Sequence, residues 1–413
     1  MRKRIFLCTI SLLCMFAFFG CQSDHAESEH TISTSSQEKE SEYTVSTPSQ
    51  EAPPEYTEGN TENMESEEKA GSIALFDSTK FNGGIDNIFY AEGSRILVYA
   101  DSFYLYDMAA EKILGEFSVS EGRVSECKFY ALPEGYALVA SRYESSSSAF
   151  SAVVKQVYCW YFDNNFVCQK TVDLTNLLLD AGGNYISSAA VSEDGKSIGI
   201  AADNALYLYN ADSNSMIPLF YYGETKYAQD LSVSELGFTE DSQKVVFTGY
   251  ALFEGQSDSV SVYGTVSVDG SGLNCQTFPE YELSREMMIF PDEIWFPEPV
   301  DKATGKVLVT DVNGSFLRVL EFEGDDTGAD GTFASDHGKY ISTICWMQEQ
   351  SSWRIRIYDS TNTKLIHEQV IEIDAEKYTS VICKVHILDD WNTCIVVAGK
   401  NQETKAISFF FQP

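Results

Sequence analysis

The stretch VSEDGKSIGIAADNALYLYN, Val191–Asn210, sets the pattern on which the fold depends. An apolar segment ends at Val191, the polar turn Ser192–Lys196 follows, and a second apolar segment begins directly after it. A third segment, ALYLYN, comes after another short turn. Asp and Gly are residues that tight reversals between antiparallel strands favour. The stretch therefore predicts consecutive antiparallel strands joined by tight turns.

The same unit recurs along the chain, which is the sign of a repeat architecture. Each copy has a strand, a polar turn with Asp or Glu, a second strand, and a third, alternating strand that ends in Asp or Asn. The copies begin near Phe89, Phe129, Ala190, Gly237 and Phe333, and the third strands end at Tyr106-Asp107, Phe162-Asp163, Tyr209-Asn210, Val268-Asp269 and Tyr358-Asp359. A further apolar run follows each of these pairs, so each unit is predicted to hold four strands.

Both faces of the predicted strands are apolar, as in ALYLYN, where Leu and Tyr alternate without a charge. A sheet with this pattern is covered on both sides, and each blade of a β-propeller packs between two neighbours. We therefore predict an all-β fold, a β-propeller of seven four-stranded blades, with six or eight blades as alternatives. The last unit shows only three strands, so the segment Ser72–Asp77 is expected to supply its outer strand and close the ring.

The polar turns resemble those of a known class of propellers. Ser192-Glu193-Asp194-Gly195-Lys196 resembles the S-x-D-G-K turn of WD-repeat-like and TolB-like β-propellers, and Ser335-Asp336-His337-Gly338-Lys339 is a looser copy. The resemblance implies a propeller over residues 72–413. The Trp-Asp pair of true WD repeats is replaced by Tyr-Asp or Tyr-Asn, and the Gly-His signature is missing. These motifs are structural, so the resemblance implies a fold and not an activity.

The N-terminus predicts export and lipidation. The positive block Met1–Arg4 precedes the apolar run Ile5–Gly20, which is shorter than the roughly 20 residues of a membrane span and typical of a signal peptide. Its end, Phe18-Phe19-Gly20-Cys21, resembles the bacterial lipobox, which implies a diacylglyceryl group and acyl chains such as palmitate on Cys21. We expect residues 1–20 to be a lipoprotein signal peptide. An uncleaved N-terminal anchor is the alternative.

Residues 21–71 are rich in Ser, Thr, Glu, Gln and Pro, and residues 22–71 contain 13 acidic and 2 basic side chains. Such a segment cannot bury enough apolar surface to offset the entropy lost on ordering. We predict a disordered, acidic tether, similar to those of Gram-positive surface lipoproteins. The expected location is the extracellular face of the cell membrane, with the membrane contacted through the lipid anchor.

The net charge of −34 limits the partners, because such a surface repels nucleic acid. It is compatible with basic proteins, divalent cations or neutral sugars. The loop with Asp325, Asp326 and Asp330 could offer oxygens to Ca²⁺, but the EF-hand spacing is absent and a solvated loop is the favoured interpretation. We predict no metal, no cofactor and a monomer.

Two kinds of side chain are candidates for special roles. In CWYFDNNFVC, a two-residue turn at Asp163-Asn164 would place Cys159 opposite Cys168, where a disulfide could form; two free thiols are the alternative. Exposed tryptophans can anchor a partner or stack on a sugar. Trp391, in an acidic turn, and Trp295 are the candidate ligand contacts, with packing between blades as the alternative for each.

No nucleophile elbow, H-E-x-x-H pair or phosphate-binding glycine loop occurs in the sequence. We therefore predict no catalytic residues and a non-catalytic binding or scaffolding module for a protein, peptide or glycan outside the cell. One alternative is a hydrolase or glycosidase-like propeller enzyme that uses paired carboxylates. The other is an accessory factor of an envelope or export machine, by analogy with TolB-like proteins.

Overall fold

The computed structural model describes residues 73–76, 87–90, 95–100, 102–107, 110, 112–119, 126–144, 153–225, 230–278, 280–281, 283, 286–298, 306–322, 331–335, 337–347, 352–372, 380–383, 393–400 and 403–410. The predicted signal peptide, Cys21, the predicted tether, the loop 323–330 and Trp391 lie outside these residues. What was predicted for them stays a prediction.

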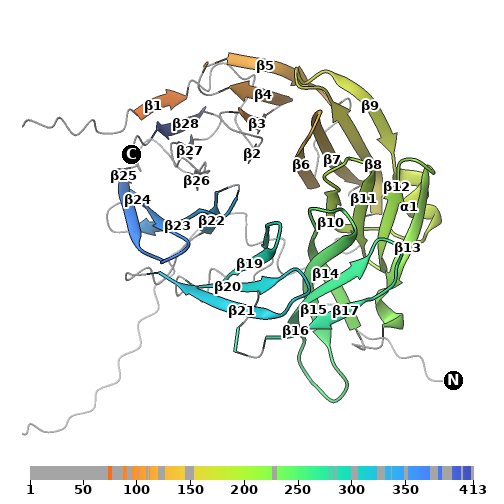
Figure 1. The fold of residues 1–413 in the computed structure, drawn as a ribbon. Helices are drawn as coiled ribbons and strands as arrows, with labels where there is room; N and C mark the ends of the chain where they lie inside the picture. The colour runs from red at the N-terminus through yellow and green to blue at the C-terminus, as the bar shows by residue number, and fades with distance from the viewer. Residues whose placement is uncertain are drawn as a thin grey trace, which may run out of the picture. The chain divides into compact units, whose positions relative to one another are not determined.

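The described strands form seven four-stranded antiparallel sheets arranged as the blades of a β-propeller (Figure 1). Six of the sheets are each built from one continuous stretch of chain, and the seventh joins the two ends of the described chain. The all-β propeller predicted from the repeats is confirmed. The rest of the described chain contains the short helix α1 (Thr175–Asp180) and the 3-10 turn η2 (Tyr222–Glu224).

The six continuous sheets follow one another along the chain. The first three are β2 (Asn87–Tyr90), β3 (Arg95–Tyr99), β4 (Phe103–Asp107) and β5 (Lys112–Phe117); β6 (Glu126–Leu132), β7 (Gly135–Glu144), β8 (Val153–Phe162) and β9 (Cys168–Asp173); and β10 (Ile186–Val191), β11 (Ser197–Ala202), β12 (Ala205–Asn210) and β13 (Ser215–Tyr221). The next three are β14 (Asp230–Phe238), β15 (Lys244–Leu252), β16 (Val260–Ser267) and β17 (Asn274–Gln276); β18 (Met288–Ile289), β19 (Glu293–Pro297), β20 (Lys306–Asp311) and β21 (Phe316–Glu321); and β22 (Gly331–Ala334), β23 (Tyr340–Met347), β24 (Ser352–Asp359) and β25 (Leu365–Glu372).

The seventh sheet has the order β1-β28-β27-β26 and contains β1 (Ile73–Phe76), β26 (Ser380–Cys383), β27 (Thr393–Lys400) and β28 (Glu403–Phe410). β1 runs antiparallel to β28, with Ile73 opposite Phe409 and Phe76 opposite Ala406. The N-terminal strand therefore completes the last sheet, as the sequence predicted. This pairing joins residues from opposite ends of the described chain.

The turn between β10 and β11 is held by the residues of the S-x-D-G-K motif. Ser192 Oγ donates to Asp194 Oδ1 at 2.7 Å and accepts the N–H of Ser197 at 2.9 Å, while the N–H of Lys196 donates to Asp194 at 3.0 Å. Gly195 has a φ of +70°, which glycine adopts without steric cost. The motif thus forms a compact, hydrogen-bonded reversal.

A second copy of this turn joins β14 and β15 with different residues. Thr239 Oγ1 donates to Asp241 Oδ1 at 2.6 Å and accepts the N–H of Lys244 at 3.2 Å. In the turn between β22 and β23, Ser335 Oγ accepts the N–H of Tyr340 at 3.1 Å, and the position of the turn aspartate is occupied by His337. The turn chemistry therefore recurs even where the motif is only partly kept.

The Asp or Asn that ends the third strand of a sheet caps the turn to the fourth. Asp163 Oδ1, for example, accepts the N–H groups of Asn165 and Val167 at 2.9 and 3.0 Å. The equivalent bonds run from Ala110 to Asp107, from Asp212 and Ser213 to Asn210, from Ser271 to Asp269, from Asn313 and Ser315 to Asp311, and from Thr361 to Asp359. The repeating aromatic-Asp pairs of the sequence are therefore turn caps.

The two faces of one sheet contribute to two separate hydrophobic clusters. On β12, Tyr207 and Tyr209 belong to a cluster shared with β8, whereas Leu206 and Leu208 belong to a cluster shared with β14–β16. All four side chains are buried. Gly237 on β14 shows how tightly neighbouring sheets pack, because a Cβ there would lie 2.2 Å from Ile289 Cδ1 on β18. Burial on both faces is what the alternation of ALYLYN predicted.

Candidate functional site

The strands that lie nearest the centre of the ring come first in the continuous sheets, as Figure 1 shows for β2, β6, β10 and β14. Side chains on these strands from different sheets can therefore meet. Ligand sites in folds of this kind form where several elements converge. We looked there for polar side chains that come together.

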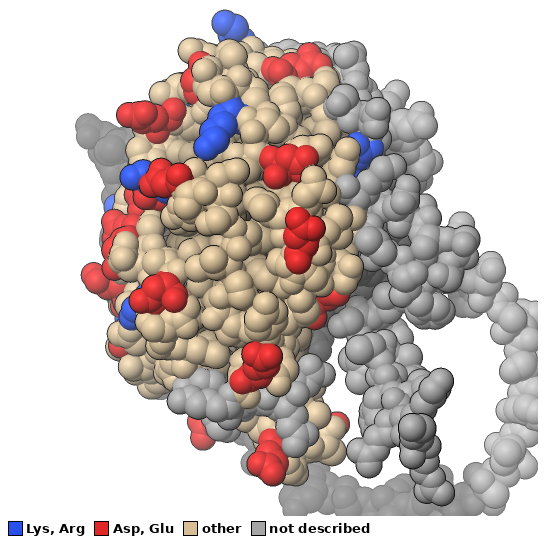
Figure 2. All heavy atoms as spheres, turned by 90° about the vertical axis from the view of Figure 1, so that its right-hand side faces the viewer, with Lys and Arg blue, Asp and Glu red and all other residues tan. Residues whose placement is uncertain are grey.

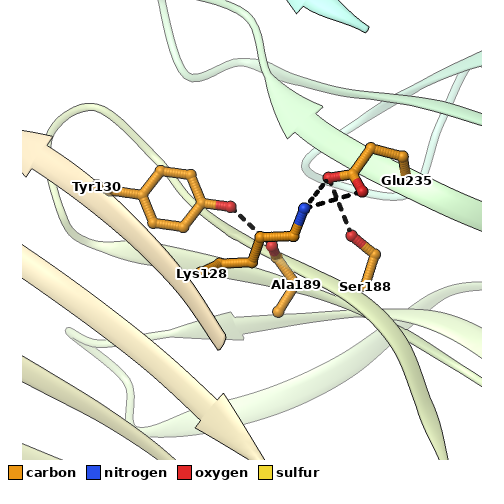
Figure 3. Close-up of polar contacts among 5 residues, drawn as sticks. All are labelled: Lys128, Tyr130, Ser188, Ala189 and Glu235. Atoms are coloured by element: carbon orange, nitrogen blue, oxygen red, sulfur yellow. Dashed lines mark hydrogen bonds and ion pairs between the residues drawn. The ribbon is translucent and has the colours of Figure 1, made fainter. Parts of the chain in front are cut away.

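A charged pair joins two of these strands across the strand between them (Figure 3). Lys128 Nζ on β6 donates to both carboxylate oxygens of Glu235 on β14, each at 2.9 Å. Ser188 Oγ on β10 donates to Glu235 Oε1 at 3.3 Å. The cluster thus ties together three consecutive sheets. The Lys128 side chain is 40% exposed and that of Glu235 is 23% exposed, so solvent reaches the pair.

Two strand irregularities accompany this cluster. The register of β10 shifts between Ile186 and Ser188, and that of β14 shifts between Val233 and Glu235. Ser187 Oγ, within the first shift, donates to the carbonyl of Val233 at 2.7 Å. Bulges re-aim side chains and are common next to functional sites. Here the bulges come directly before Ser188 and Glu235, which are hydrogen-bonded to each other.

Tyr130, also on β6, lies beside this cluster. Its Oη donates to the carbonyl of Ala189 at 2.7 Å (Figure 3). Burial raises the pKa of Tyr130 well above its usual value, and the negative charge of Glu235 adds to this. The phenol therefore stays protonated and acts as a hydrogen-bond donor between two sheets.

The polar groups of the cluster bond to groups on neighbouring sheets. An ammonium group has three N–H donors, and two of those on Lys128 are directed at Glu235. A glycosidase would need a second carboxylate within about 10 Å of the first. The remaining acidic residues of the innermost strands are Glu126 and Asp230, whose side chains lie outside the described set. The cluster therefore serves first as a polar link between sheets.

The predicted pairing of Cys159 with Cys168 is wrong. Cys159 lies opposite Val172 and Cys168 lies opposite Phe162, and both thiols are free. The turn is not the expected two-residue reversal, because Phe166 adopts a φ of +61° and the N–H of Asp163 bonds to the carbonyl of Val167. Burial raises the pKa of the Cys159 thiol to about 12, which makes it inert at neutral pH.

Trp295 has the packing role that was the alternative interpretation. Its side chain is 3% exposed and its ring lies 4.6 Å from that of Phe290. Its Nε1 donates to Glu293 Oε2 at 2.8 Å, and Arg318 binds both oxygens of that carboxylate at 2.6 and 2.8 Å. The hydrogen bond from Arg318 is the main reason that the pKa of Glu293 lies below its usual value. Trp295 thus belongs to the core of its sheet and is not a surface contact.

Within the described residues, no group of three or more His, Cys, Asp and Glu side chains is placed to hold a metal ion. No helix in that part of the chain is both long and apolar enough to cross a membrane.

The outer strands show a second feature that the sequence analysis missed. Apolar side chains are exposed on or beside β9, β13, β21 and β25: Val167, Ile217, Tyr221, Phe316, Leu317, Leu365, Ile366 and Val370. The available signal was the apolar fourth segment of each repeat, such as SMIPLFY at 215–221. The predicted burial of both faces of the strands holds for the third segments but not for these side chains. An outer strand has no further strand beyond it, so part of its surface faces solvent.

No protein-family model matches this chain, and no similar sequence is found among curated proteins. The likeness to WD-repeat-like and TolB-like propellers remains a resemblance of turn motifs.

Proposed function

We propose that the protein is a non-catalytic binding or scaffolding module that presents a β-propeller outside the cell to a protein, peptide or glycan. The observation that carries the proposal is the set of apolar side chains exposed on the outer strands of several sheets. Exposed apolar surface rimmed by polar residues is typical of interaction sites. Sheets packed on both faces would hold such side chains in fixed positions, which lowers the entropy lost on binding.

The location is part of the same proposal and is supported by the sequence alone. The positive block Met1–Arg4, the short apolar run and the Gly20-Cys21 junction favour a lipidated Cys21. The acidic segment that follows would extend under its own charge repulsion. A module on such a tether could reach partners at a distance from the membrane.

Panels of peptides, proteins and oligosaccharides applied to the purified full-length protein would test the binding function. We expect saturable binding of at least one class, weakened by a pair of serine substitutions on one outer strand, such as Phe316→Ser with Leu317→Ser. Turnover of a chromogenic glycoside that is abolished by Glu235→Gln would instead support the enzyme alternative and overturn the proposal.

The anchor has its own test. Replacing Cys21 by Ala should release the protein into the medium, while replacing Cys14 within the apolar run should not. Retention of the Cys21→Ala variant in the membrane fraction would contradict the lipid anchor and leave the binding function to be judged from the panels.

A further inference from the structure

The strand that closes the ring is held differently from the other outer strands. β1 pairs with β28 alone, over the four residues Ile73–Phe76 (Figure 1). Of the described strand pairs, β1–β28 is the only one whose members are not consecutive in the chain, because β2, the next strand after β1, belongs to another sheet. β28 also pairs with β27, over the eight residues Glu403–Phe410. The weaker hold is therefore on β1.

The place of β1 in the chain decides how it is loaded. The predicted tether ends at residue 71 and β1 begins at Ile73, so a pull through the tether reaches β1 before any other described strand. β1 runs antiparallel to β28, and a pull directed away from β28 acts first on the pair Ile73–Phe409 and last on the pair Phe76–Ala406. Pairs loaded in turn resist less force than pairs loaded together, since each bears the full load alone.

We propose that β1 is a latch that tension on the tether releases, so that the closure of the ring is lost and the edge of β28 is exposed. The proposal rests on the tether described above and goes beyond the proposed binding function. When a bound partner moves away from the membrane, the tether transmits the pull to β1. The unpaired N–H and C=O groups of β28 then become available to another strand.

The tether can load β1 only if it does not adhere to the propeller. Residues 22–71 contain 13 acidic and 2 basic side chains. Figure 2 shows acidic side chains spread over one side of the propeller, with fewer basic ones among them. Because like charges repel, this side offers the tether no counterpart. The pull therefore stays on the chain that enters β1.

The neighbouring strands hold longer under the same pull. β2 is loaded only after β1 has left, because residues 77–86 lie between them in the chain. Release of β1 frees residues 73–86, which extend by at most about 50 Å. Unfolding of the whole of residues 73–410 would free about 1,100 Å of chain. The two events therefore differ clearly in length.

Force spectroscopy on the purified full-length protein tests the latch. One handle is attached at Asn60, in the predicted tether, and the other at Ser213, in the exposed turn between β12 and β13. Both are joined through unnatural amino acids, so that the native thiols are not used. We expect a first step of about 50 Å or less, at a lower force than the unfolding of the rest of the propeller.

A disulfide lock supplies the variant and its control. Ala74 lies opposite Ser408, and directly opposite positions on paired strands are close enough for a disulfide. In the variant Ala74→Cys, Ser408→Cys the first step should disappear under oxidising conditions and return on reduction. The matched control Ala398→Cys, Lys405→Cys joins β27 to β28 at opposite positions and should keep the first step.

Hydrogen exchange without force decides the question if the disulfide does not form. A strand that opens separately from the ring exchanges its amide hydrogens faster than the strands that stay closed. We expect the amides of β1 to exchange at least about tenfold faster than those of β27.

Four results would overturn the proposal. They are a single step that unfolds the whole propeller, a first step much longer than about 50 Å, a first step that persists in the oxidised lock, and equal exchange rates in β1 and β27. None of them bears on the binding function, which the panels test without tension, or on the lipid anchor, which the Cys21→Ala variant tests.

Discussion

The sheets β10–β13 and β22–β25 follow one plan and differ mainly at their outer edges. Both have a serine-capped turn between their first and second strands, at Ser192 and at Ser335, and both expose apolar side chains on the fourth strand. On β25, Lys364 precedes the exposed residues and Glu368 is paired with Arg356. Beside β13, Asp212 and Glu224 are exposed and form no ion pair within the described residues, and the exposed Lys196 lies in a turn whose backbone bonds to Ala211.

This difference shows that apolar exposure and the charge beside it are separate properties. Apolar exposure accompanies the outer position in the sheet, because several outer strands share it. The charges beside the exposed apolar side chains differ between the two sheets. The position of a strand in its sheet therefore accounts for apolar exposure but not for the charges beside it.

The largest effect would come from removing the strand that closes the ring. Deleting Ile73–Phe76 exposes the edge of β28, and since each sheet packs against its neighbours, β10–β13 and β22–β25 should both lose stability. We expect the melting temperature to fall by about 10 °C or more, measured by calorimetry. Hydrogen exchange at Ile198 and Ile341 should accelerate together.

Deletion of Glu62–Glu65 from the predicted tether is the control and should leave the melting temperature unchanged. If loss of β1 left it unchanged as well, or exposed only one of the two sheets to exchange, the two sheets would have to be treated as independent units.

A smaller effect is expected from the turn that the two sheets build differently. Asp194→Ala removes the carboxylate that accepts hydrogen bonds from Ser192 Oγ and the N–H of Lys196. The turn at Ser335 has His337 instead of aspartate at the equivalent position. The free energy of unfolding should fall by about 1 kcal/mol, measured by urea titration. Glu193→Ala, in the same turn, should have no effect. Equal effects of the two substitutions would mean that the motif is incidental.

The loss of stability caused by Asp194→Ala should depend on pH. Partial burial opposes ionisation of Asp194, but hydrogen bonds from Ser192 and the Lys196 N–H outweigh it, so its pKa lies below the usual value. A lowered pKa stabilises the fold above the unfolded-state pKa of about 3.9, and this contribution is lost as the pH falls through the folded-state pKa. The difference between wild type and Asp194→Ala should therefore shrink below about pH 4. A difference that stays constant on acidification would contradict the role of the carboxylate.

Much of the fold could be predicted from the sequence because its signals are local. The turn at Ser192–Lys196 and the Asp or Asn caps each lie within a few residues of the strands they join. Closure by the N-terminal strand followed from counting three strands in the last unit. The predicted disulfide failed because register depends on the turn, and Phe166 with its positive φ lengthens that turn beyond two residues.

The central cluster could not be predicted in the same way. Lys128 and Glu235 are 107 residues apart, and their contact depends on the curvature of the ring and on two bulges. The exposure of Ile217 was missed because it depends on the place of β13 at the outer edge of its sheet. Trp391, the lipidation of Cys21 and the acidic loop with Asp325 remain predictions from sequence alone.

Closure by β1 also fixes the order in which the ring can be finished during synthesis. β1 emerges from the ribosome among the first strands of the ring, but its partner β28 ends at Phe410, near the end of the chain. A long-range pairing of this kind forms slowly, and until it forms the open edges of β1 and β27 can pair with other chains. A nascent chain cut short before Glu403 would therefore carry two unpaired edges and be a target for aggregation or proteolysis.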